Sequence, residues 1–494
     1  MRITPQMNIV FNEMMDDWLS AQARANPHGV ALTFAGDAWT WRALHEDVDA
    51  LCRRLATLRL PAGGIIAMHL PNNAQAVQCV HAAARMGFTL SPLNTRLTHA
   101  ELRAQLALLQ ADALVCNDAA LCEAMRDVTS QAVTMDALLA QPAQAFEQQP
   151  LQLNHLQAIV FTSGSAGAPK GVSLTFGNHL YSALGSAARL GALPTDCWLS
   201  CLPLYHVGGL SVVFRAALYG FTIALHERFD VAVFRQALVD QPITLVSLVP
   251  TMLRRLMDAD VTWPASLRAT LLGGAAAPAA LLAEALARGI PIATTYGLTE
   301  TASQVATQTP EATTRKPSSV GRPLLFAQVR IVDGSGGALP ANTIGEIVVR
   351  GPAVMQEYFR NAPATARALR DGALFTGDLG YLDDDGDLFL VQRRSDLIVS
   401  GGENVYPSEV EEALRAIDGV EDALVIGLPD EEWVQRVAAL ITPRDGELLE
   451  VDLRSALSGR VAGYKIPRVM RIVPQLPLLP NGKIDRVGAA LLFD

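Results

Sequence analysis

Apolar runs and amphipathic stretches alternate along the chain up to about residue 390. Residues 73–86 have the apolar spacing of a helix and precede a strand-like run at 88–91. A helical pattern at 278–288 likewise precedes a strand pattern at 290–294. This alternation is typical of α/β proteins. We therefore expect a large unit of stacked α/β sheets.

The pattern becomes strand-rich beyond residue 329. Short apolar runs at 329–332 and 347–350, with Asp-Gly and Gly-Gly turns between them, predict a small β-rich subdomain. The acidic run 383–387 has the composition of a calcium loop. If Gly386 took the sixth position of an EF-hand loop, however, the first position would be Tyr381, which is not an acidic ligand. Because a strand pattern follows at once, a hairpin turn is expected there.

A new pattern begins after residues 393–396. A helix is predicted from Pro407, with three glutamates in its first turns that favour the helix dipole, and residues 422–427 predict the next strand. The chain is thus divided into a large N-terminal domain, 1–392, and a small α+β C-terminal domain, 393–494.

The loop 162–171, T-S-G-S-A-G-A-P-K-G, has the composition of a phosphate-binding loop. Glycines let backbone N–H groups turn inward, hydroxyls add donors, and Lys170 adds a positive charge. The flanking residues 158–161 and 171–175 read as strands, so the element is strand–loop–strand and differs from a Walker A loop. The alternative is a glycine-rich surface turn with a solvated lysine.

Composition and charge narrow the class of protein. Half of the 494 residues are hydrophobic and 18% are charged, as in a globular protein. A net charge of −10 argues against nucleic acid as the main partner. We find no membrane span and no signal-peptide pattern, and expect a cytoplasmic protein. The six cysteines show neither a disulfide framework nor zinc spacing, so structural thiols are expected. The oligomeric state stays open, a homo-oligomer included.

Two further segments place polar residues in apolar surroundings. In 294–300, Tyr296 offers a ring for a base, Thr299 a phosphate donor and Glu300 an oxygen ligand for Mg²⁺. In 375–380, Asp378 follows a strand and could accept two ribose hydroxyls. Each segment could equally be an ordinary polar loop or turn.

Five motifs in order carry a family resemblance: T-S-G-S-A-G-A-P-K-G, Y-G-L-T-E, T-G-D-L-G, R-R-S-D-L-I-V-S-G-G-E-N-V-Y-P-S-E-V-E and P-N-G-K-I-D-R. The chain resembles the adenylate-forming superfamily of acyl- and aryl-CoA ligases, luciferases and nonribosomal adenylation domains. Within it, residues 202–215, 225–230 and 296–304 are most similar to the 2-succinylbenzoate–CoA ligases of menaquinone biosynthesis.

The resemblance implies two half-reactions that use ATP, Mg²⁺ and CoA. A carboxylate attacks the α-phosphorus of ATP to give acyl-AMP and pyrophosphate, and the CoA thiol then displaces AMP. The first step brings two anions together, which calls for cations rather than a general base.

The resemblance also implies roles for individual residues. Phosphates would be held by Thr162, Ser163, Gly164, Ser165, Gly167, Lys170 and Thr299, the metal by Glu300, adenine by Gly274, Ala275, Tyr296 and Gly297, and the ribose by Asp378 and Arg393. Lys483 would bridge the carboxylate and the α-phosphate, His206 would lie at the acyl pocket, and Gly401 and Gly402 would open the path of the CoA thiol.

The resemblance also marks two further positions. Ala166 stands where the family usually has threonine, so weaker ATP binding is expected, by about the 0.5–1.5 kcal/mol of one neutral hydrogen bond. Ser395 matches the family's hinge, which makes the C-terminal domain mobile between two poses.

The acyl substrate is inferred from Arg215. It is the cation of an otherwise apolar helix, 210–218, one turn from Ser211. An arginine in such a helix needs an anion, and 2-succinylbenzoate keeps one ring carboxylate after activation. Ser303 and Gln304 could add hydrogen bonds. The alternative for Arg215 is a structural ion pair.

Three functions therefore compete. The leading one is a 2-succinylbenzoate–CoA ligase, and the second is another aryl- or medium-chain acyl-CoA ligase. The third is a non-catalytic nucleotide-binding homologue, which the presence of Lys483 and Glu300 disfavours. An adenylation domain that serves a carrier protein is also disfavoured, because no carrier domain follows Asp494, although a carrier on a separate chain stays open.

Overall fold

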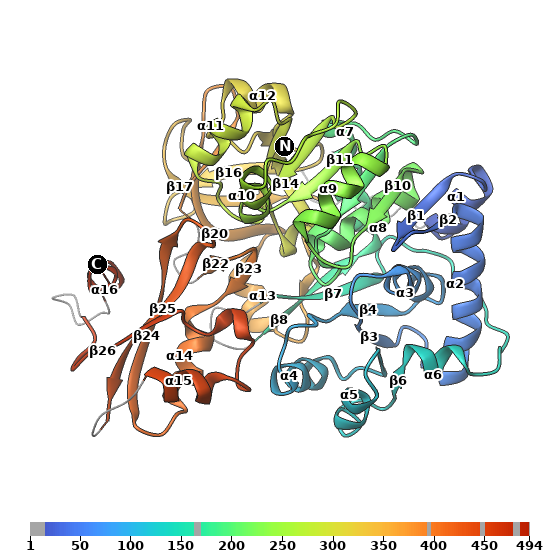
Figure 1. The fold of residues 1–494 in the computed structure, drawn as a ribbon, viewed down its shortest axis with the longest axis horizontal. Coiled ribbons are helices and arrows are strands. Elements are labelled where there is room, and N and C mark those ends of the chain that lie inside the picture. The colour runs from blue at the N-terminus through green and yellow to red at the C-terminus, as the bar shows by residue number, and fades with distance from the viewer. Residues whose placement is uncertain (1–14, 163–168, 393–396, 445–449, 478–484, 494) are drawn as a thin grey trace, which may run out of the picture.

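The computed structural model describes residues 15–162, 169–392, 397–444, 450–477 and 485–493 (Figure 1). The predicted boundary at 393–396 and the predicted hinge Ser395 lie outside these ranges. They remain predictions from the sequence.

The larger central sheet has nine strands within the described residues. In spatial order they are β15 (Arg322–Pro323), β14 (Ser303–Thr307), β13 (Ile292–Leu298), β12 (Ala269–Leu272), β11 (Leu245–Leu248), β9 (Cys197–Ser200), β10 (Thr222–Leu225), β1 (Val30–Phe34) and β2 (Asp37–Thr40). Pairs from β13 to β1 run parallel, with antiparallel strands at both edges. Inner strands such as β11 are buried along their whole length, in agreement with their mostly apolar sequence.

The second central sheet has seven strands in the described part of the chain. They are β18 (Glu357–Tyr358), β8 (Lys170–Thr175), β7 (Leu156–Thr162), β4 (Thr89–Pro92), β3 (Ile65–His69), β5 (Ala113–Cys116) and β6 (Ala132–Thr134). Strands β7 and β8 pair antiparallel, with Thr162 opposite Lys170. The predicted strand–loop–strand arrangement is therefore confirmed.

Helices form three layers around these two sheets. The helices and 3₁₀ turns of this region are α1 (Trp18–Ala25), α2 (Trp41–Leu55), η1 (Ala56–Leu58), α3 (Ala74–Arg85), α4 (His99–Leu109), α5 (Ala119–Ala124), α6 (Met135–Leu139), α7 (Phe176–Leu190), α8 (Val207–Tyr219), α9 (Val231–Asp240), α10 (Pro250–Asp258), α11 (Ala279–Ala287), η2 (Thr299–Thr301), α12 (Pro310–Arg315) and α13 (Ala362–Ala368). The main core joins both sheets to α1, α2, α3 and α8. A second core packs α9, α10 and α11 on the outer face of the nine-stranded sheet, and a third packs α4 and α5 on the seven-stranded one. None of the described helices is long and apolar enough to cross a bilayer.

Two smaller sheets complete the fold. The β-rich subdomain contains β16 (Gln328–Val332), β17 (Gly345–Arg350), β20 (Ala373–Leu382), β19 (Leu369–Arg370) and β21 (Leu388–Gln392). The C-terminal unit, orange to red in Figure 1, contains β23 (Glu403–Val405), β22 (Ile398–Ser400), β25 (Val434–Pro443), β24 (Val420–Asp430), β26 (Val469–Ile472), α14 (Pro407–Arg415), α15 (Glu450–Leu457), η3 (Gly463–Lys465) and α16 (Arg486–Leu491). The predicted α/β fold class is confirmed.

The acidic run forms the predicted turn between β20 and β21. The carboxylates of Asp383, Asp385 and Asp387 lie 2.6, 2.6 and 2.8 Å from the ammonium of Lys316. The lysine therefore supplies the positive charge that these three side chains need.

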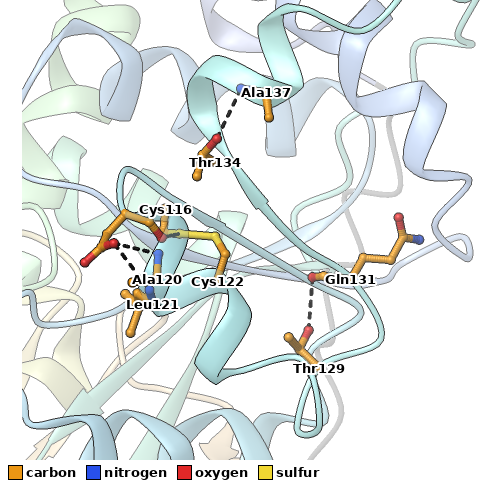
Figure 2. The surroundings of a disulfide bond; sticks show 9 residues. Cys116, Ala120, Leu121, Cys122, Thr129, Gln131, Thr134 and Ala137 are labelled. Carbon is orange, nitrogen blue, oxygen red and sulfur yellow. Dashed lines mark hydrogen bonds between the residues drawn. A yellow bond between two sulfur atoms is a disulfide. The ribbon is translucent and has the colours of Figure 1, made fainter.

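The cysteines correct one expectation. Cys116, at the end of β5, and Cys122, in α5, form a disulfide, with Cα atoms 6.9 Å apart (Figure 2). The Asp118 carboxylate accepts hydrogen bonds from the N–H groups of Ala120 and Leu121, and this cap turns the chain from the strand into the helix. The expectation that all six cysteines are free thiols was wrong. Cys116 and Cys122 are brought together by the turn between β5 and α5, which their spacing in the sequence does not reveal.

Candidate active site

A cavity of about 650 Å³ lies at the carboxyl ends of the parallel strands of the nine-stranded sheet. Residues at or just after the ends of β9, β11, β12 and β13 line it, and so does the segment 401–404 of the C-terminal unit. The carboxyl end of a parallel sheet is the usual ligand site of α/β folds, and this volume suits a small molecule. The cavity therefore depends on both parts of the chain.

Several residues predicted to bind the nucleotide meet in this cavity. They are Thr162, Gly274, Gly297, Thr299, Glu300 and Asp378. Glu300 is buried and accepts a hydrogen bond from the Tyr358 hydroxyl, at 2.6 Å. The Lys170 ammonium lies 5.2 Å from the centre of the same Tyr358 ring. Tyr358 of β18 thus connects the base of the predicted phosphate loop to the predicted metal ligand.

Four predicted residues lie elsewhere. Tyr296 is 1% exposed and donates its hydroxyl to Asp378, at 2.7 Å, so its ring lies in the core rather than on the cavity surface. Neither Ala275 nor Lys170 lines the cavity. Ser211 is also buried outside it, and its hydroxyl lies 3.5 Å from the carbonyl oxygen of Gly208.

Other predicted residues fall outside the described ranges. They are Ser163, Gly164, Ser165, Gly167, Arg393 and Lys483. Their assignments remain predictions from the sequence.

Arg215 of α8 also lines the cavity and is 2% exposed. Its Nε and Nη2 atoms are buried without a hydrogen-bond partner, and no acidic side chain among the described residues pairs with it. Its guanidinium lies 5.8 Å from the Trp198 ring centre. Burial lowers the pKa of Arg215 to about 10, so it is still charged at neutral pH. The structure contains no internal partner for this charge among the residues it describes.

Ser303 and Gln304 of β14 line the same cavity. The Gln304 amide donates to the Thr307 hydroxyl, at 2.9 Å, and its oxygen is buried without a partner. The cavity lining therefore combines a cation that lacks an ionic partner with an unbonded hydrogen-bond acceptor, among the described residues.

His206 lies at the boundary between the two parts of the chain. Its Nε2 atom is 3.2 Å from an oxygen of Glu403, and Arg96 binds the other oxygen at 2.9 Å. Burial alone would raise the pKa of Glu403, but the hydrogen bond and charge of His206, together with Arg96, lower it to about 2. Glu403 is therefore a carboxylate that joins the C-terminal unit to the cavity wall.

A second ionic contact crosses the same boundary. The ammonium of Lys465 is 2.7 Å from Glu101 of α4 and 2.6 Å from Glu409 of α14. The Lys465 side chain is 5% exposed. Burial lowers its pKa, but the two carboxylates outweigh this effect and raise it. A charged lysine thus bridges the N-terminal and C-terminal units.

Family models match most of the chain. The AMP-binding enzyme model matches residues 19–359, and the AMP-binding enzyme C-terminal domain model matches residues 409–483. The chain belongs to the AMP-binding enzyme family. A member of this family, the 2-succinylbenzoate–CoA ligase of Bacillus mycoides, is 38% identical over 476 residues, which cover 96% of this chain and 98% of that protein.

Two solved structures of o-succinylbenzoate CoA synthetase from Bacillus subtilis are also similar, each at 35% identity. A double mutant bound with its product analogue OSB-NCoA has a TM-score of 0.93 and covers 96% of this chain and 98% of that chain. The complex with the acyl-adenylate intermediate OSB-AMP has a TM-score of 0.77 and covers 97% and 98%.

At the domain boundary of this AMP-binding enzyme, His206 was predicted from the sequence, whereas its partner Glu403 and the other ionic residues were not. Glu403 directly follows the predicted Gly401 and Gly402, so that motif could have drawn attention to it. No sequence motif marks Arg96, Glu101 or Lys465, because their ionic partners lie far away in the sequence.

Proposed function

We propose that this chain is an ATP-dependent acid–thiol ligase that converts 2-succinylbenzoate to its CoA thioester. In the first half-reaction the succinyl carboxylate attacks the α-phosphorus of ATP and pyrophosphate leaves. In the second, the CoA thiol attacks the acyl carbon and AMP leaves. The curated relatives support this reaction, and the observation that carries the choice of acid is the unpaired guanidinium of Arg215 in the cavity.

The nucleotide end fits ATP and Mg²⁺, the small molecules this reaction uses. Thr162 and Thr299 would donate to phosphate oxygens, and Asp378 would accept from the ribose. Glu300, whose carboxylate is already oriented by Tyr358, would hold Mg²⁺ through a hard oxygen ligand. The metal would neutralise phosphate charge.

The acyl end fits a dianionic acid. An unpaired charge in a buried site is costly, so a site that keeps one is built for a ligand of opposite charge. After the succinyl carboxylate of 2-succinylbenzoate is activated, its ring carboxylate remains to pair with Arg215. An aryl- or medium-chain acid without a second carboxylate would leave this cation unpaired, which disfavours the alternative ligases.

The arrangement of the two units supports the second half-reaction. The two Bacillus subtilis structures are covered almost equally at the same identity, yet the product-analogue complex scores 0.93 and the acyl-adenylate complex 0.77. We therefore attribute the difference in TM-score to a different arrangement of the two domains in the two complexes. The segment 401–404 lines the cavity in this arrangement, and its Glu403 contacts His206.

The choice of acid is tested with 2-succinylbenzoate and 4-oxo-4-phenylbutanoate, which lacks only the ring carboxylate. ATP–pyrophosphate exchange across a panel of acids should favour 2-succinylbenzoate. The substitution Arg215→Gln should lower kcat/KM for 2-succinylbenzoate about thirtyfold to several thousandfold, since removing one partner of a desolvated pair costs roughly 2–5 kcal/mol. The truncated acid should lose little.

Arg268 provides the matched control. Its guanidinium pairs with the buried Asp196 at 2.6 Å and does not line the cavity. Arg268→Gln should therefore slow both acids by the same factor. If Arg215→Gln behaves in the same way, Arg215 is structural and the assignment of 2-succinylbenzoate loses its support.

A further inference from the structure

On two helices that pack together, buried polar atoms lack hydrogen-bond partners among the described residues. They are Nε and Nη2 of Arg215, the Tyr219 hydroxyl on the same helix, α8, and both ring nitrogens of His179 on α7. Buried polar side chains in proteins are nearly always hydrogen-bonded. A group of them without partners around a charged side chain therefore indicates a site that is completed when its ligand binds.

His179 belongs to α7, which packs against the helix that carries Arg215. It is 2% exposed, does not line the cavity, and its ring centre is 4.7 Å from that of Phe214, the residue before Arg215. Burial and then the charge of Arg215 lower the pKa of His179 to about 3. The imidazole is therefore neutral and offers one lone pair and one N–H group.

The hydrogen-bonding capacity of Arg215 requires a second acceptor. A guanidinium has five N–H donors, and a bidentate carboxylate occupies two of them. The remaining buried donors need an acceptor that is not an anion, because a second carboxylate would neutralise the charge meant for the substrate. The lone pair of a neutral histidine meets this requirement.

We propose that His179 is a positioning residue that orients the Arg215 guanidinium toward the ring carboxylate of the acyl substrate, directly or through one buried water. This inference rests on the proposed function. It assigns part of the discrimination between dianionic and monoanionic acids to a side chain that never touches the substrate.

The test compares two variants with the same two acids. His179→Phe keeps a ring against Phe214 but removes both nitrogens, and should raise KM for 2-succinylbenzoate roughly ten- to hundredfold with little change in kcat, as for loss of one hydrogen bond to a charged group. KM for 4-oxo-4-phenylbutanoate should stay within about twofold. His179→Gln restores an acceptor and a donor and should recover most of the loss. In the Arg215→Gln background, His179→Phe should have no further effect.

The matched control is Tyr181→Phe. Tyr181 lies on α7, as His179 does, but its ring packs on Phe326, so this substitution should leave the preference between the acids unchanged. One outcome refutes the role of His179 and leaves the proposed function standing. In that outcome the wild type prefers 2-succinylbenzoate, Arg215→Gln abolishes the preference, and His179→Phe retains it. If His179→Phe slows both acids equally, His179 is structural, which also refutes its role. If wild type shows no preference, both proposals fail.

Discussion

Glu403 connects the chemistry of the cavity to the position of the C-terminal unit through a single carboxylate. Its oxygens contact Arg96, Tyr205 and His206, all from the N-terminal unit. Three donors around a buried carboxylate favour its charged form. The residue thus acts as an ionic anchor for the segment that closes the cavity.

We predict that Glu403→Gln slows thioester formation from supplied acyl-AMP at least about tenfold, because a hydrogen bond to a charged group is worth roughly 1.5–3 kcal/mol. ATP–pyrophosphate exchange should remain near wild type, since we propose that the contact belongs to the arrangement that forms the thioester. An equal loss in both half-reactions would contradict this role.

The same carboxylate predicts a pH dependence. The pKa of Glu403 is lowered from 4.5 to about 2, so its contribution is fully present above about pH 4.5 and is lost as the pH falls toward 2. The ratio of wild-type to Glu403→Gln thioester rates should therefore be constant from pH 5 to 8 and fall below that range. A ratio that changes between pH 6 and 8 would assign the effect to another group.

Residues differ in how far the sequence predicts their roles. Arg215 was identified because a cation in an apolar helix contradicts its surroundings, and that contradiction is local. Arg96 and Glu403 were not identified as partners, because their pairing depends on how two distant parts of the chain approach each other. Tyr296 is the opposite case, since its motif was recognised but its ring lies in the core, bound to Asp378.

At the scale of elements, the N-terminus of α4 forms a docking point for the C-terminal unit. Glu101 completes a capping box with Thr98 and also binds Lys465. Helix geometry thereby fixes the carboxylate that receives the buried lysine. The sequence predicted the nearby strand at 88–91 through its apolar run, but neither this contact nor the disulfide between β5 and α5, since both depend on spatial approach.

We predict that Glu101→Gln weakens this docking without unfolding α4. Glutamine also forms capping boxes, so the helix start is preserved while the charge facing Lys465 is lost. Lys465 keeps Glu409, which limits the effect to about five- to thirtyfold in the thioester step. Circular dichroism should show unchanged helix content, and ATP–pyrophosphate exchange should be unchanged. A loss of helix content would instead assign the defect to the cap.

At the scale of the whole molecule, the N-terminal and C-terminal units share one cavity and are joined by the contacts of Glu403 and Lys465. The fold class followed from the alternation of strands and helices, and the new pattern after residues 393–396 predicted two units. Their relative placement could not be predicted in the same way, because it rests on a few ionic contacts between distant segments. Such contacts can form in one arrangement and break in another, as two successive half-reactions require.

The hinge prediction tests this exchange of arrangements. Ser395, outside the described residues, matches the hinge of the family, and proline fixes φ near −65° and also restricts the preceding residue. Ser395→Pro should therefore spare ATP–pyrophosphate exchange and slow thioester formation. Lys483→Ala is the complementary control: it should nearly abolish exchange and spare thioester formation from supplied acyl-AMP, because its charge is needed only while the α-phosphorus is attacked. If Ser395→Pro keeps wild-type rates in both steps, the hinge lies elsewhere. If it loses only ATP–pyrophosphate exchange, the proline holds the domains in the arrangement described here.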